Sequence, residues 1–116
     1  MRIELEHGFL EISPEVFTAI IGNAATNCFG VKGMASASVS DGIVKLLRKE
    51  NLSRGVRFTA EPDGSVSIKL HIVVKHGVNI SAVCRSIISE VRYNVENITG
   101  IKVSNVDVCV DSIMSD

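Results

Sequence analysis

The chain has 116 residues, a formal net charge of −1, 46% hydrophobic residues and 22% charged residues. This length suits one domain, and the composition excludes a disordered, collagen-like or low-complexity chain. Aromatic residues make up only 4%, so the core must be aliphatic and a base-stacking surface for nucleic acid is disfavoured.

The first predicted elements are a short extended segment at 9–12 and a helix behind it. Ser13 is a good helix cap and Pro14 suits the first helical position. The apolar positions that recur at helical spacing are Phe17, Ile20, Ile21, Ala24 and Cys28. Gly30 and Gly33 then predict the end of the helix.

The middle of the chain predicts a β-hairpin after a poorly patterned stretch. Residues 33–55 are small or weakly patterned, with Asp41 as a candidate cap for a short helix. Residues 56–60 and 66–74 each alternate apolar and polar side chains, and the segment 61–64 between them has turn chemistry. The two strands therefore predict an antiparallel hairpin with one wet face.

The last third predicts a long helix and a final strand. Asn79 can cap the helix and Gly100 can end it. The predicted apolar stripe is Cys84, Ile87, Ile88, Val91, Val95 and Ile98, and the opposite side carries Arg85, Ser89, Arg92 and Glu96. The strand over 101–110 changes its apolar phase, which predicts a bulge at Ser104 and Asn105.

The element order is therefore β-α-(short α)-β-β-α-β. It predicts an α+β fold in which two main helices pack on one face of a three- to four-stranded, mostly antiparallel sheet. No internal repeat, linker or low-complexity segment interrupts this order. We expect one domain over residues 1–116.

Histidines and cysteines are the candidate reactive groups. His71 and His76 flank the end of the long strand, and a metal site there would also need Cys84 and Cys109. A nucleophilic pair of Cys84 with His76 is the other reactive interpretation. Solvated histidines and inert packed thiols explain the same residues more simply. We predict no catalytic, cofactor or metal site, and no enzyme.

The cysteine count and the chain start indicate where the protein works. Three scattered cysteines without a CxxC pair are typical of a reduced, cytoplasmic chain. The N-terminus carries no apolar segment typical of a secretory signal, and no apolar run approaches the roughly 18–20 residues that span a bilayer. We expect a cytoplasmic protein that reaches a membrane only through its surface or a partner.

Basic charge is concentrated in one segment. Residues 42–60 carry five basic residues and one acidic residue, a net +4, in a chain of net −1. The basic residues are Lys45, Arg48, Lys49, Arg54 and Arg57. A solvated helix face is the simplest interpretation, and a docking surface for an acidic protein, a membrane or nucleic acid is the functional one. These five residues are the predicted interaction surface.

Six short motifs occur in a familiar order. They are Gly8-Phe9-Leu10-Glu11-Ile12-Ser13-Pro14-Glu15-Val16, Gly30-Val31-Lys32-Gly33-Met34, Leu52-Ser53-Arg54-Gly55-Val56-Arg57, Gly77-Val78-Asn79-Ile80, Thr99-Gly100 and the valine-rich stretch Val103 to Val110. Their order and spacing resemble the alkaline shock protein family, the envelope stress response proteins of Gram-positive bacteria. The resemblance covers about residues 8–111.

The resemblance implies a non-enzymatic, cytoplasmic scaffold or adaptor in cell-envelope homeostasis that acts by protein–protein contact. Family members self-assemble, sit at the membrane through a membrane-anchored partner, or are encoded near a fatty-acid kinase, which a member would regulate as a partner. The family brings no cofactor and no catalytic residue. This chain lacks the long charged tails of larger members and has Ser81 where relatives often have Pro. The alternative function is a nucleic-acid-binding module that uses the basic segment.

Overall fold

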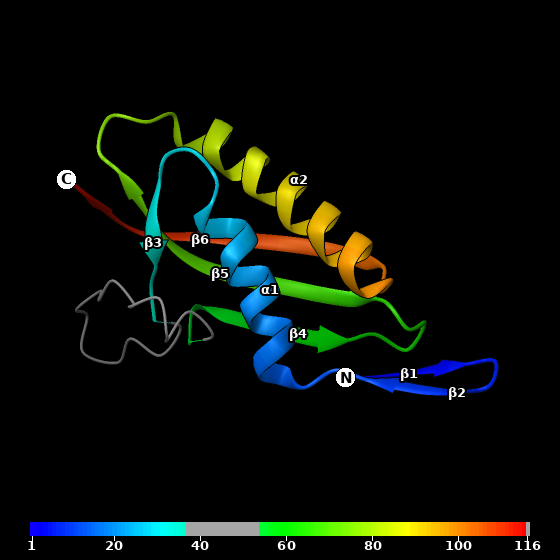
Figure 1. The fold of residues 1–116 in the computed structure, drawn as a ribbon. Coiled ribbons are helices and arrows are strands. Elements are labelled where there is room, and N and C mark those ends of the chain that lie inside the picture. The colour runs from blue at the N-terminus through cyan, green and yellow to red at the C-terminus, as the bar shows by residue number, and fades with distance from the viewer. Residues whose placement is uncertain (37–53, 116) are drawn as a thin grey trace.

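The computed structural model describes residues 1–36 and 54–115 (Figure 1). Its elements in chain order are β1 (Arg2–Leu5), β2 (Gly8–Glu11), α1 (Pro14–Thr26), β3 (Val31–Met34), β4 (Val56–Ala60), β5 (Val66–Lys75), α2 (Ile80–Thr99) and β6 (Val103–Met114). Two helices cover one face of a four-stranded sheet, and β1 and β2 form a separate antiparallel hairpin. The predicted α+β class is confirmed.

β5 is the central strand of the sheet. Along one edge it pairs antiparallel with β4 and then with β3, so these two short strands lie end to end. Along the other edge it pairs in parallel with β6, because α2 carries the chain back to the start of the sheet. The predicted hairpin of β4 and β5 is confirmed, with a register from Val56↔Leu70 to Ala60↔Val66.

β6 contains two bulges. The register moves from Val66↔Val103 to Ser67↔Asn105, so Ser104 is the extra residue and the predicted bulge is confirmed. A second shift leaves Asp111 as the extra residue, and the sequence pattern did not predict it. Between the bulges, residues 105–110 form a regular run.

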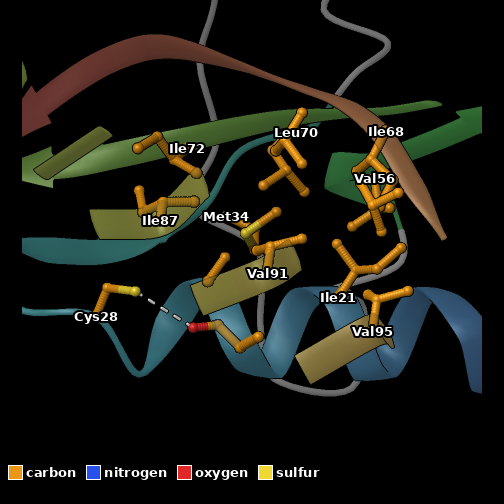
Figure 2. Packing of buried hydrophobic residues seen from close by; sticks show 14 of the residues in the cluster. Ile21, Cys28, Met34, Val56, Ile68, Leu70, Ile72, Ile87, Val91 and Val95 are labelled. Carbon is orange, nitrogen blue, oxygen red and sulfur yellow. Dashed lines mark hydrogen bonds between the residues drawn. The ribbon is translucent and has the colours of Figure 1, made fainter. Parts of the chain in front are cut away.

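The core lies between the helices and the sheet, and it is aliphatic as predicted. Figure 2 shows side chains from α1, α2, β3, β4 and β5 interlocking there; those labelled on these elements are Ile21, Met34, Val56, Ile68, Leu70, Ile72, Ile87, Val91 and Val95. Burial of each such side chain contributes about 1.5–3 kcal/mol relative to exposure. Phe17 adds an edge-to-face contact with Phe58, with ring centroids 4.7 Å apart.

The predicted start of α1 is confirmed, but its predicted end is wrong. The Ser13 hydroxyl accepts a hydrogen bond from the Val16 N–H at 3.2 Å and caps the helix. The helix ends at Thr26 because the chain turns before Gly30, which has a φ of +88°. Gly33 lies in β3, a strand too short for its alternation to stand out from the sequence. The short helix predicted at 41–49 lies outside the described residues.

The predicted bounds of α2 are confirmed, with an Asn79 cap and a left-handed Gly100 at its end. The buried residues are Val83, Ile87, Val91 and Val95. Ile88 and Ile98, placed on the apolar stripe by the sequence, are 37% and 60% exposed, and Cys84 is only half-buried. The buried stripe is narrower than predicted, because a single row of side chains spaced four residues apart packs into the core. Among the described helices, none is both long and apolar enough to cross a bilayer.

Candidate interaction surfaces

The structure describes only part of the predicted basic surface. Lys45, Arg48 and Lys49 lie outside the described residues. Arg54 is exposed just before β4, and Arg57 is exposed within β4. Arg54 and Arg57 therefore lie on either side of Val56, the first residue of the edge strand β4.

Arg57 belongs to a charged row on the sheet face that the helices leave open. Its register partner on β5 is Lys69, whose partner on β6 is Asp107. All three residues are exposed. The row is therefore mixed in sign, which weakens its attraction for the phosphates of nucleic acid. Phe58 packs against Phe17 on the helix side, so it offers no stacking ring on the open face.

The open face also carries a side-chain pair that the sequence did not reveal. His71 Nδ1 lies 2.9 Å from Asp111 Oδ2, with the two side chains 18% and 23% exposed. His71 is on the central strand and Asp111 is the extra residue of the second bulge, so the pair ties β6 to β5. The sequence signal for this pair is Asp111, a carboxylate that directly follows the alternating valines of the last strand. Cys109 is the register partner of His71.

Two of the three thiols are poorly suited to nucleophilic chemistry. Burial raises the pKa of the Cys28 thiol, which donates to the Ala24 carbonyl at 3.4 Å. Burial likewise raises the pKa of Cys84. Raised values keep both thiols protonated at neutral pH, and the thiolate is the reactive form. No hydrogen bond joins Cys84 to His76, the other member of the predicted pair, although the structure describes both residues.

The candidate metal ligands do not converge. Within residues 1–36 and 54–115, no three side chains of His, Cys, Asp or Glu gather closely enough to hold a metal ion. His71 is committed to Asp111, whereas His76 is exposed in the turn after β5.

The two outer edges of the sheet are the most extensive interaction features. β6 forms one edge, and β3 with β4 forms the other. No strand in the described part of the chain pairs with the outer side of either edge. Each edge therefore presents backbone groups that can pair with another chain.

Comparison with known sequences gives one family and several relatives. Residues 2–115 match the alkaline shock protein 23 family, described as having a cell envelope-related function. The uncharacterized protein YloU of Bacillus subtilis is 38% identical over 116 residues, which cover 97% of this chain and 96% of that protein. The uncharacterized protein Spy1614 of Streptococcus pyogenes is 37% identical over 114 residues, with 97% and 93% covered. No solved structure matches this chain.

Proposed function

This chain belongs to the alkaline shock protein 23 family, and from that membership we propose that it is a cytoplasmic scaffold or adaptor of the cell envelope. The resemblance seen in the sequence is thereby confirmed, and a cell envelope-related function comes with the family. The finer proposal is that the protein has no enzymatic activity and works by contact with proteins, including further copies of itself.

The observation that carries this proposal is the pair of outer sheet edges, neither of which pairs with another strand of the described chain. β4 and β6 lie at opposite edges and run in opposite directions, because β4 is antiparallel to β5 and β6 is parallel to it. The β6 edge of one copy, placed beside the β4 edge of an equally oriented copy, would therefore form an antiparallel ladder. The same contact can repeat from copy to copy, as a heterologous interface does.

Two features limit the strength of this pairing. The bulges at Ser104 and Asp111 confine the regular part of β6 to residues 105–110. The exposed Asp107 adds a charge in the middle of that run. Bulges and charges are the devices that keep edge strands from uncontrolled aggregation. We therefore expect an association that depends on concentration.

Sedimentation velocity over a wide concentration range tests the proposal, and proline at the edges locates the contact. On β4 the N–H of Glu61 donates inward to Ser65, so the alternation of the ladder turns the Ala60 N–H outward. Ala60→Pro removes this outward donor without removing a ladder bond, so the fold should survive.

On β6 the matching position is Val108. The Val66 N–H donates to the Lys102 carbonyl, so alternate residues of β5, including Leu70, face β6. In a parallel ladder the residue directly opposite turns its own groups to the far edge, and Val108 is opposite Leu70. Val108→Pro therefore blocks the outer edge of β6.

We expect the wild type to grow into larger species with concentration, and both proline variants to associate more weakly than the wild type. Ala60→Ser and Val108→Thr keep the backbone donors and should associate like the wild type. The proposal of edge pairing is wrong if both proline variants, folded by circular dichroism, associate like the wild type. A wild type that stays one species at every concentration contradicts self-association itself.

The neighbouring pair Arg57 and Lys69 supports a second candidate, which is binding of RNA on the open face. RNA binding at low salt should then fall steeply as salt rises, because released counterions drive it. The charge-reversed variant Arg57→Glu should lose it. If no RNA binds at low salt, the RNA-binding candidate is wrong and the scaffold proposal is the one that remains.

A further inference from the structure

The N-terminal hairpin is a largely exposed apolar projection, and within the described chain only Ile3 of its two strands packs against the core. Leu5 is 58% exposed, and Phe9 and Leu10 are also exposed. The registers Ile3↔Leu10 and Leu5↔Gly8 place Ile3, Leu5 and Leu10 on one face of the hairpin. A two-stranded hairpin with three large apolar residues is marginal in water alone, so it gains from a surface that covers it.

A groove with a mostly apolar lining lies where α1 ends and α2 begins. It has a volume of about 440 Å³ and is lined by Phe29, Gly77, Val78, Asn79, Ala82, Val83 and Ser86. Phe29 is 86% exposed beside it. Figure 1 shows the hairpin at one end of the molecule and the loop between β5 and α2 at the other. The molecule is 51 Å long and 28 Å wide, so the two features are well separated.

Phe29 is held in place rather than carried on a loose loop. Cys28 before it is buried. Gly30 after it packs so closely on α2 that a Cβ there would lie 2.7 Å from Val83 Cγ2. The Gly30 carbonyl also accepts a hydrogen bond from the Lys75 N–H at 2.9 Å. An exposed phenyl ring on a fixed backbone loses only side-chain freedom, and no backbone freedom, when a partner covers it.

The charges of the two features are complementary. Residues 1–11 carry three glutamates against one arginine and the Met1 ammonium, whereas residues 75–89 carry Lys75 and Arg85, and the first carboxylate after them is Glu90. The first turn of α2, at the groove, also contains no acidic residue, and carboxylates stabilise a helix N-terminus. The hairpin therefore complements this groove both in charge and in apolar surface.

We propose that the β1–β2 hairpin of one copy docks in the Phe29 groove of the next copy. This inference rests on the proposed self-association and adds a second, independent contact to it. Because the two surfaces differ and lie at opposite ends, the contact is heterologous and links copies head to tail. Leu5 and Leu10 would cover the groove walls, and the hairpin glutamates would face Lys75, Arg85 and the start of α2.

The test uses the full chain with Val108→Pro, so that edge pairing is blocked and docking is measured alone. In this background we expect association that weakens about 10- to 100-fold on Phe29→Asp, from the loss of one buried aromatic side chain. Leu5→Gln should weaken it in the same direction. Tyr93→Asp and Val16→Gln are the matched controls, because both residues are exposed and lie outside the groove and the hairpin. The controls should associate like their parent.

Mixing then distinguishes docking from any symmetric contact. The Phe29→Asp chain retains its hairpin, and the Leu5→Gln chain retains its groove. Each should be monomeric alone, and an equimolar mixture should form a 1:1 dimer that does not grow further. Docking is wrong if the mixture stays monomeric, or if Phe29→Asp and Leu5→Gln associate like the parent. Edge pairing fails separately, when Ala60→Pro and Val108→Pro in otherwise wild-type chains change nothing.

Discussion

Residues 1–36 and 54–115 contain two antiparallel hairpins, which have the same kind of backbone pairing and differ in burial and surroundings. In β4–β5, residues such as Val56, Ile68 and Leu70 are buried. In β1–β2, Ile3 is half-buried and every other residue of the two strands is exposed. β4–β5 has β6 beside it and two helices over one face, whereas no described strand pairs with β1–β2 and no described helix covers it. Backbone pairing gives both hairpins their shape, and burial gives only one of them its stability.

This contrast explains which hairpin is available to bind a partner. A hairpin that stabilises the core cannot leave it to bind another chain without loss of the fold. The β1–β2 hairpin is anchored at its base, where the Met1 ammonium donates to the Ile12 carbonyl and the Ile12 N–H donates to the Met1 carbonyl, both at 2.7 Å. Its tip is therefore positioned by the body but independent of it, as a docking element requires.

The largest expected contrast is in amide hydrogen exchange. The amides of β5 should exchange only when the whole protein unfolds, whereas those of β1–β2 should exchange through local opening. We expect β5 amides to exchange at least about 1,000-fold more slowly in dilute protein, since global stability is typically ~5–15 kcal/mol. Mass spectrometry or NMR measures this directly. Equal protection of the two hairpins would contradict the comparison, and protection of β1–β2 that rises with concentration would support docking.

Truncation of one leucine in each hairpin sharpens the comparison. Leu70 is fully buried, and Leu70→Ala should lower the free energy of unfolding by about 2–5 kcal/mol, through lost burial and the cavity left behind. Leu5 is mostly exposed, so Leu5→Ala should change it by less than about 0.5 kcal/mol. Urea denaturation at low protein concentration measures both values. Similar losses in the two variants would mean that the N-terminal hairpin is part of the core.

The two hairpins also show what the sequence can predict. The β4–β5 hairpin was predictable, because long alternation on both sides of Pro62-Asp63-Gly64 indicates strands and a turn together. The first strand, β1, was missed, because it has only four residues, too few for the alternation of Ile3 and Leu5 with Arg2 and Glu4 to stand out. β3 was missed for its length as well, and its Gly33 resembled a helix end.

The interaction surfaces were less predictable than the fold for the same reason. Periodicity reports which residues a helix or strand buries, and it says little about groups brought together from distant segments. The His71–Asp111 pair depends on a bulge that shifts the register, and the Phe29 groove depends on the close approach of Gly30 to Val83. The predicted basic surface is described only at Arg54 and Arg57, so it stays a prediction.

Glycine substitution provides a smaller contrast between the hairpins. Gly64 in the β4–β5 turn has a φ of +89°, with open space where a Cβ would lie. Gly64→Ala should therefore cost about 1–2 kcal/mol of unfolding free energy, from backbone strain alone. Gly8 in β2 has no such φ and also faces open space, so Gly8→Ala should be neutral or stabilise by up to about 1 kcal/mol. Thermal denaturation of both variants checks the difference, and a loss at Gly8 equal to that at Gly64 would contradict it.

The smallest expected effect is the pH dependence that Asp63 gives to the β4–β5 turn. Its carboxylate accepts hydrogen bonds from the Ser65 hydroxyl at 2.6 Å and the Ser65 N–H at 3.0 Å, and these lower the pKa of Asp63. A lowered folded pKa means that the charged form stabilises the turn above the unfolded pKa of about 3.9. This contribution should disappear as the pH falls through the lowered folded value.

Asp63→Asn keeps an oxygen that can accept from the Ser65 N–H but has no proton to gain, so it isolates this charge. The stability advantage of the wild type over Asp63→Asn should be constant from about pH 5 to 7 and should shrink below about pH 4, because the carboxylate becomes protonated. Urea denaturation at a series of pH values measures the difference. Ser65→Ala removes the main cause of the lowered pKa and should flatten the same acid dependence. A difference between wild type and Asp63→Asn that stays constant down to pH 2 would mean that the turn is held by its backbone, as β1–β2 is, and that the charge adds nothing.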